Sequence, residues 1–149
     1  MKIEFDDNYF MSKAIDEAKI ALSKGEVPIG AVIVADNKII ARAHNMVEAL
    51  NDVTAHAEIL AITSASNYIG GKYLENCSIY VTLEPCQMCA GALYWSRISK
   101  IYFGAEDPKR GFKKLVTKLH PKTKVFGGIL QNECKDLLDK FFISRRNLN

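Results

Sequence analysis

Three side chains in two short segments have the types and the spacing of metal ligands. His56 lies in Thr-Ala-His-Ala-Glu (54–58). Cys86 and Cys89 lie in Leu-Glu-Pro-Cys-Gln-Met-Cys-Ala (83–90), at the expected start of a helix. Because the two cysteines are three residues apart, they lie on one face of that helix. The free N–H groups and the dipole of a helix start favour the thiolate, which is the form that binds metal.

The number of ligands distinguishes a catalytic zinc site from a structural one. Structural sites take four protein ligands, whereas catalytic sites take three and leave one position for water. Here the ligands are one histidine and two cysteines, and Cys77 and Cys134 form no second close pair. Glu58, two residues after His56, is placed to accept a proton from that water. The sequence predicts a catalytic zinc site, with a closed structural zinc site and a redox Cys-x-x-Cys as alternatives.

The pattern of apolar residues predicts the elements that position these side chains. Apolar residues recur at helical spacing over 8–23, and two short apolar runs flank Asp36-Asn37, which is typical of a β-hairpin. After the hairpin, helices alternate with strands, which indicates an α/β fold, a three-layer α/β/α sandwich with a central mixed five-stranded sheet. The expected helices are 8–23, 55–66, 86–96 and 129–145, and the expected strands are 29–35, 38–43, 78–83, 100–105 and 124–126.

Length and composition indicate an ordinary globular protein. The 149 residues suit a single domain over 1–149, and 48% of them are hydrophobic and 25% charged. No run approaches the roughly 18–20 apolar residues that cross a bilayer, and the first residues lack the apolar run of a secretion signal. We therefore expect a cytoplasmic protein without a membrane segment, whose four cysteines form no disulfide framework.

Basic residues are concentrated in two places, although the formal net charge is only +3. Seven lysines and arginines lie in 109–124, where there is no acidic residue, and Arg145 and Arg146 end the last expected helix. Clusters of this kind can bind phosphates, although a solvated basic face gives the same pattern.

The two ligand segments resemble the signature of the zinc-dependent nucleoside and nucleobase deaminases, His-x-Glu followed by Pro-Cys-x-x-Cys. Within this class the chain is similar over nearly its whole length to the bacterial tRNA-specific adenosine deaminases. The similar segments are 25–34, the region of Asn45, 51–62, 80–93, 103–111 and 128–146. The resemblance implies a cytidine deaminase-like fold, one Zn²⁺ per subunit and a homodimer. It also implies hydrolysis of adenosine to inosine at the wobble position of a tRNA anticodon loop, with release of ammonia.

The resemblance implies a pocket for the adenosine beside the zinc site. Such enzymes extrude the target nucleotide from its stack, and a base in a loop costs less to extrude than a paired one. Asn45 would hydrogen-bond the extruded adenosine. The wall of the base pocket would consist of Val27, Pro28 and Ile29.

The resemblance also implies contacts with the rest of the tRNA anticodon stem-loop. Asp107, in the segment Phe-Gly-Ala-x-Asp, would contact the nucleotides that flank the target. Arg145 and Arg146 would lie near the anticodon loop. Phe141 and Phe142 precede them, and we expect at least one of these rings in the core because apolar residues at helical spacing are usually buried.

The chain departs from the family's pattern at several positions. Val53 replaces the usual proline, Glu106 stands where a basic residue is frequent, and Tyr94-Trp95 resembles guanine deaminases of the same fold. A guanine or other free nucleobase or nucleoside deaminase is therefore the alternative within the class. A non-catalytic zinc module that binds RNA is the alternative outside the class, and replacement of Glu58 separates it from an enzyme.

Overall fold

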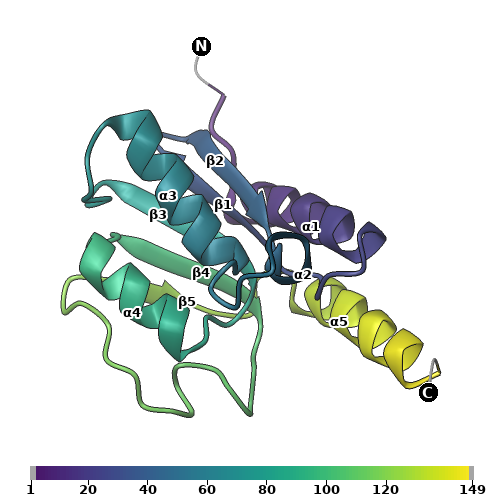
Figure 1. Cartoon of the computed structure of the whole chain (residues 1–149). Coiled ribbons are helices and arrows are strands. Elements are labelled where there is room, and N and C mark those ends of the chain that lie inside the picture. Colours follow the sequence, from purple (N-terminus) through teal and green to yellow (C-terminus); the bar gives the residue numbers. More distant parts are fainter. Residues whose placement is uncertain (1–2, 148–149) are drawn as a thin grey trace.

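The computed structural model describes residues 3–147 as one five-stranded sheet between two layers of helices (Figure 1). The sheet order is β2-β1-β3-β4-β5, in which β1 is antiparallel to both neighbours and β3, β4 and β5 are parallel. The strands are β1 (Gly30–Ala35), β2 (Lys38–His44), β3 (Cys77–Leu83), β4 (Lys100–Ala105) and β5 (Lys124–Phe126). The helices are α1 (Asp7–Ser23), α2 (Val47–Leu50), α3 (Ala57–Ile69), α4 (Gln87–Ser96) and α5 (Gln131–Arg146). The predicted three-layer sandwich around a mixed sheet is confirmed.

The central strands contribute to two hydrophobic cores, because successive side chains of a strand point to opposite faces. In β1, Ala31 and Ile33 pack in the core beneath α3 and α4. Val32 and Val34 pack in the core beneath α1 and α5. Since helices cover both faces, the inner strands β1, β3 and β4 are mostly buried along their length.

The hairpin between β1 and β2 turns at the two residues that the sequence indicated. Asp36 and Asn37 have positive φ angles of 50° and 60°. Ala35 pairs directly with Lys38 across the turn. Two left-handed residues in a two-residue loop match the twist of the flanking strands, and Asn and Asp tolerate this conformation.

Two helices differ from the expected ones. The helix expected at 55–66 is α3, which continues to Ile69 and ends at Gly70, whose φ of 77° stops it. The four-residue α2 was not expected, because one turn is too short to show a periodicity. The other boundaries agree with the expected ones or differ from them by one or two residues.

Gly30 marks a place where α1 packs directly on β1. A Cβ atom there would overlap the carbonyl oxygen of Ala14 and lie 2.5 Å from the amide nitrogen of Ala18. Because these backbone atoms cannot rotate away, we expect Gly30→Ala to lower the free energy of unfolding by about 1–3 kcal/mol. Urea denaturation measures this difference.

Gly91→Ala is the matched control, because a Cβ atom at Gly91 in α4 meets nothing within 4 Å. Alanine is favoured over glycine within a helix by up to about 1 kcal/mol. We therefore expect this variant to be as stable as the unaltered protein or slightly more stable. Equal destabilisation of the two variants would contradict the close packing at Gly30.

Candidate active site

The candidate site lies at the end of the sheet where β3 and β4 end and α3 and α4 begin. Ligands of open α/β sheets commonly bind beyond the carboxyl ends of the parallel strands. His56 is the N-cap residue of α3, and Cys86 is the N-cap residue of α4. Cys89 follows within the first turn of α4, so two helix starts bring all three predicted ligands together.

The ligand atoms have the spacing that zinc requires. His56 Nδ1 lies 3.6 Å from Cys86 Sγ and 3.5 Å from Cys89 Sγ. Tetrahedral zinc with Zn–N of about 2.1 Å and Zn–S of about 2.3 Å separates its N and S ligands by about 3.6 Å. All three atoms lie within 4.8 Å of one another, and residues 3–147 contain no second such group of His, Cys, Asp or Glu. The donor set and its geometry therefore fit a zinc ion.

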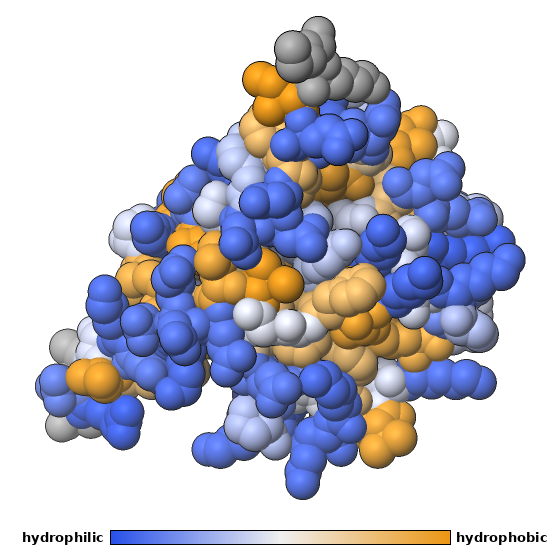
Figure 2. All heavy atoms as spheres, turned by 180° about the vertical axis from the view of Figure 1, so that it is seen from behind, coloured by the Kyte–Doolittle hydropathy of each residue, from blue (hydrophilic) through white to orange (hydrophobic). Residues whose placement is uncertain are grey.

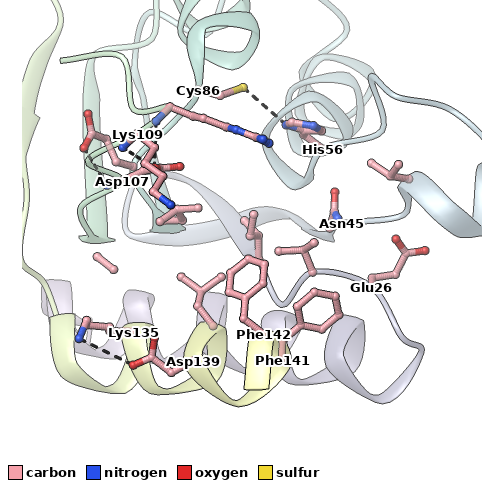
Figure 3. A pocket seen from close by; sticks show the side chains of 18 of the residues that line it. Glu26, Asn45, His56, Cys86, Asp107, Lys109, Lys135, Asp139, Phe141 and Phe142 are labelled. Atoms are coloured by element: carbon pink, nitrogen blue, oxygen red, sulfur yellow. Dashed lines mark hydrogen bonds and ion pairs between the residues drawn. The ribbon is translucent and has the colours of Figure 1, made fainter. Parts of the chain in front are cut away.

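The surroundings favour a thiolate at Cys86. A hydrogen bond from the Cys89 thiol lowers the pKa of Cys86 to about 4, and a smaller contribution comes from His56. The same sulfur–sulfur hydrogen bond raises the pKa of Cys89. The contact between Cys86 and His56, drawn as a dashed line in Figure 3, raises the pKa of His56. The surroundings thus favour the anionic form of Cys86, which is the form that binds a metal cation.

Glu58 is a buried carboxyl group in the first turn of α3 and is only 4% exposed. Burial raises the pKa of Glu58 to about 7. Its Oε1 atom has no hydrogen-bond partner among the described residues, although buried carboxylates are normally paired with donors. A carboxyl group with a pKa near 7 can both accept and release a proton, so this position suits a general acid and base.

A cavity of about 1500 Å³ includes His56, Glu58 and Cys86 in its lining. Asn45 also lines it and is 5% exposed, and the buried Asn45 Oδ1 has no partner in the described part of the chain. In Figure 3 the labelled rings of α5 lie on the opposite side of the cavity from His56 and Cys86. The cavity is therefore open in front of the ligand group and contains a second polar side chain that is free to bind a ligand.

The structure brings together two of the three residues expected in the base-pocket wall. Val27 and Ile29 line the cavity. Pro28 is buried and is not among the lining residues. Asn45 N donates to Ile29 O at 3.0 Å, which ties this wall to the segment that carries Asn45.

The residues expected to contact the tRNA outside the base pocket also line the cavity, and each of the three forms a hydrogen bond within the protein. Asp107 Oδ1 accepts hydrogen bonds from the backbone N–H groups of Lys109 at 3.1 Å and Arg110 at 3.0 Å. Arg145 Nη2 donates to the carbonyl oxygen of Gly25 at 2.6 Å. Arg146 lines the same cavity.

The two phenylalanines of α5 differ in exposure. Phe141 is buried, whereas Phe142 is 49% exposed. The guanidinium group of Arg145 lies over the Phe141 ring at 5.0 Å from its centroid. The expectation that at least one of the two rings belongs to the core is confirmed.

Glu26 is a buried carboxylate of the cavity lining that the sequence did not indicate. It is 2% exposed, and its two oxygens accept the backbone N–H groups of Glu48 at 3.0 Å and Ala49 at 2.8 Å. These donors belong to α2, which follows Asn45 in the chain. Glu26 therefore fixes the segment that presents Asn45. Its partners lie 22 and 23 residues away, so no local spacing could have revealed the contact.

Glu84 is a second buried carboxylate of this kind and is 4% exposed. Its Oε1 accepts the N–H of Asp107 at 3.1 Å, and its Oε2 accepts the N–H of Lys113 at 3.0 Å. A Cβ atom at Gly111 would overlap the Glu84 carboxylate, so only glycine fits the turn around it. Glu84 therefore ties the loop that carries Asp107 to the strand that leads into Cys86.

We expect Glu84→Gln to loosen this loop, because glutamine retains one acceptor oxygen and leaves one buried N–H without a partner. Such a loss costs about 1–3 kcal/mol. Hydrogen exchange should become faster at the amides of Asp107 and Lys113. Glu106→Gln is the control, because Glu106 pairs with Lys113 at 3.3 Å on the surface, where ion pairs contribute about 0–1 kcal/mol. Unchanged protection in Glu84→Gln would show that the carboxylate does not hold the loop.

The chain is similar to characterised proteins over most of its length. Residues 5–105 match the family described as the cytidine and deoxycytidylate deaminase zinc-binding region. The tRNA-specific adenosine deaminase of Bacillus subtilis (strain 168) is 47% identical over 142 residues, which cover 91% of this chain and 88% of that protein.

Solved structures with the same fold include two kinds of deaminase. A structure from a study of A-to-I editing by tRNA:A34 deaminases at the wobble position of transfer RNA has a TM-score of 0.83 and 43% identity, covering 87% of this chain and 99% of that one. A guanine deaminase from Bacillus subtilis has a TM-score of 0.66 and 37% identity, covering 75% of this chain and 69% of that one. The ligand group, the fold and the similarity along the chain agree: this protein belongs to the zinc-binding cytidine and deoxycytidylate deaminase family and, within it, to the tRNA-specific adenosine deaminases.

Proposed function

We propose that this chain converts adenosine to inosine at the wobble position of a tRNA anticodon loop and releases ammonia. The observation that carries the proposal is one cavity lined by His56 and Cys86 of the ligand group, which also holds two buried oxygens without a partner in residues 3–147, Glu58 Oε1 and Asn45 Oδ1. The choice of substrate is supported by the tRNA-specific relative, which is 47% identical over 91% of the chain. The guanine deaminase is 37% identical over 75% of the chain.

In this proposal the residues of the site have separate chemical roles. His56, Cys86 and Cys89 would hold a zinc ion, which when bound would activate a water molecule as the nucleophile for C6 of adenine. Glu58 accepts a proton from the attacking water and transfers it to N1 of adenine. Glu58 then takes the remaining proton from the new hydroxyl group at C6 and delivers it to the amino group, so that the C6–N bond breaks and ammonia leaves. The oxygen of the water becomes O6 of inosine, so the atoms balance.

The cavity binds the extruded nucleoside through Asn45 and the apolar wall of Val27 and Ile29. An unpaired buried polar group costs about 1–3 kcal/mol, and a substrate that hydrogen-bonds Asn45 recovers this free energy. Pro28 lies behind the wall and shapes it from the protein side. The same cavity is lined by Asp107, Arg145 and Arg146. In this proposal these side chains contact the nucleotides of the anticodon loop that neighbour the target, and the chain is an RNA-binding protein.

We infer a homodimer from the outer face of α3 and α4. Around these helices Tyr68 is 62% exposed, Ile69 45%, Tyr73 40% and Trp95 76%. A second hollow, of about 620 Å³, lies beside Tyr73 and Trp95. Contiguous exposed apolar side chains of this kind mark protein interaction sites, and a second copy of the chain offers a surface of the same chemistry.

We also infer that the protein is a single domain over 1–149 and acts in the cytoplasm, where its proposed tRNA substrate is found. The central sheet contributes to both hydrophobic cores, which supports one folding unit. Within residues 3–147, none of the helices is both long enough and apolar enough to cross a membrane.

We expect the protein to form inosine in an anticodon stem-loop RNA with adenosine at the wobble position. Digestion of the RNA to nucleosides and chromatography measure the product, and free guanine is tested in parallel. A stem-loop with the adenosine moved to another loop position is the control and should react much more slowly. Deamination of guanine without inosine in the RNA would replace this proposal by the free-base alternative.

We expect Glu58→Ala and Glu58→Gln to retain one zinc ion per chain and to lose activity by a factor of about 10² to 10⁴, which is typical for removal of a general acid or base. Metal analysis and the inosine assay measure the two properties. Cys86→Ala should instead lower both the zinc content and the thermal stability, because metal binding is coupled to folding. Loss of zinc from Glu58→Gln would mean that Glu58 is a ligand and not the proton carrier.

A further inference from the structure

The connection from β4 to β5 returns along the length of the strands and contains no helix or strand. The two strands are parallel, and Lys100 at the start of β4 pairs with Lys124 at the start of β5. The segment 106–123 therefore returns from one end of the sheet to the other (Figure 1). Since β4 has six residues, the distance is about 20 Å.

This connection presents a row of exposed cations. No acidic residue occurs from 108 to 132. Among the described residues only Lys113 of this group forms an ion pair, with Glu106. Long hydrophilic side chains project from the lower edge of the molecule in Figure 2, where the segment lies in Figure 1. The members of this row, here termed the basic stripe, are Lys109, Arg110, Lys113, Lys114, Lys118, Lys122 and Lys124, and all are exposed.

The backbone of the stripe is held in place although it has no regular structure. Phe112 is buried and meets Phe103 edge to face. Leu119 packs against the core beneath α3 and α4. Thr123 Oγ1 donates to the carbonyl oxygen of Ile98 at 2.6 Å. The cations are therefore presented from a fixed backbone, which lowers the entropy lost when they bind a ligand.

The stripe begins at the cavity and supplies a charge that the cavity lacks. Lys109 and Arg110 line the cavity. The whole lining contains six lysines and arginines (Lys24, Lys109, Arg110, Lys135, Arg145, Arg146) and seven acids (Glu26, Glu48, Glu58, Glu84, Glu106, Asp107, Asp139). Such a lining gives no net attraction to a polyanion. Next to the cavity, residues 108–132 contain no acidic side chain, so the stripe adds the net positive charge that attracts a polyanion.

We propose that the basic stripe binds the phosphates of an RNA helix adjoining the loop whose base enters the cavity. This inference rests on the proposed function. A nucleic-acid helix presents a phosphate charge every few ångströms along its axis, so a row of about 20 Å faces several of them. The stripe starts at Lys109 and Arg110 in the cavity lining, so it lies next to the place where the loop base would enter. The lysines act as sequence-independent contacts that fix the register of the stem.

The test uses the full-length zinc protein with Lys114, Lys118 and Lys122 all changed to Gln, because none of the three lines the cavity. For a fluorescent anticodon stem-loop we expect Kd and KM to rise about tenfold or more at low salt, while kcat at saturating RNA stays the same. The slope of log Kd against log salt should become shallower by about 2 to 3, which corresponds to three lost phosphate contacts. On an unpaired RNA with only the loop sequence, the difference between the two proteins should shrink.

The matched control changes Lys13, Lys19 and Lys38 to Gln, which removes the same charge from α1 and from β2 at the opposite edge of the sheet. Equal Kd values for the two triple variants would contradict phosphate binding by the stripe. If the stripe variant raised Kd for the unpaired RNA as much as for the stem-loop, an RNA helix would not be the partner of the stripe. A changed mass by light scattering would assign the stripe to a protein interface instead. Absence of inosine with the unaltered enzyme would overturn the proposed function, which is a separate result.

Discussion

The spacing of three ligand atoms is the constraint on which the rest of the structure depends. A zinc site tolerates deviations of about 0.2 Å in its bond lengths, yet His56 and Cys86 come from helices 30 residues apart in the chain. Only the packing of α3 and α4 on one face of the sheet brings their first residues to the same point. The face of α3 that meets the sheet is built from alanines, which let the helix approach closely: Ala57, Ala61 and Ala65. The composition of this core is thus set by the site that it supports.

Three buried carboxylates line the cavity, and they differ in their hydrogen-bond partners. Glu26 and Glu84 each accept two backbone N–H groups, so each ties a loop to the body of the protein. Glu58 is equally buried, and one of its oxygens has no partner in residues 3–147. Burial raises the pKa of Glu58 to about 7. The same type of side chain is thus a fixed anchor where donors converge, and at Glu58 it has the free oxygen among the described residues that the proposed proton transfer requires.

The sequence predicted the zinc ligands, Glu58 and the layers of the fold because each depends on local patterns. His-x-Glu, Cys-x-x-Cys and the alternation of strands with helices are all readable within a few residues. The anchoring roles of Glu26 and Glu84 were not predictable, since their donors lie 22 to 29 residues further along the chain. Position 28 shows the same limit: Pro28 lies between two lining residues in the sequence, but it is buried and does not line the cavity.

The loop between β4 and β5 shows how a surface can be shaped for charge and not for packing. A helix in this crossover would have to bury one face, which would remove some of its cations from solvent. The loop keeps all of them exposed and buries only isolated anchors such as Phe112. At its tip, Val116 has a φ of 53°, a conformation that costs a β-branched residue about 1–3 kcal/mol. The hydrogen bond from Thr117 N to Phe112 O closes this turn, so that lysines on both sides of it face outward. The turn therefore leaves Lys114 and Lys118 exposed on either side of Val116, and the loop keeps its cations in solvent without a helix to carry them.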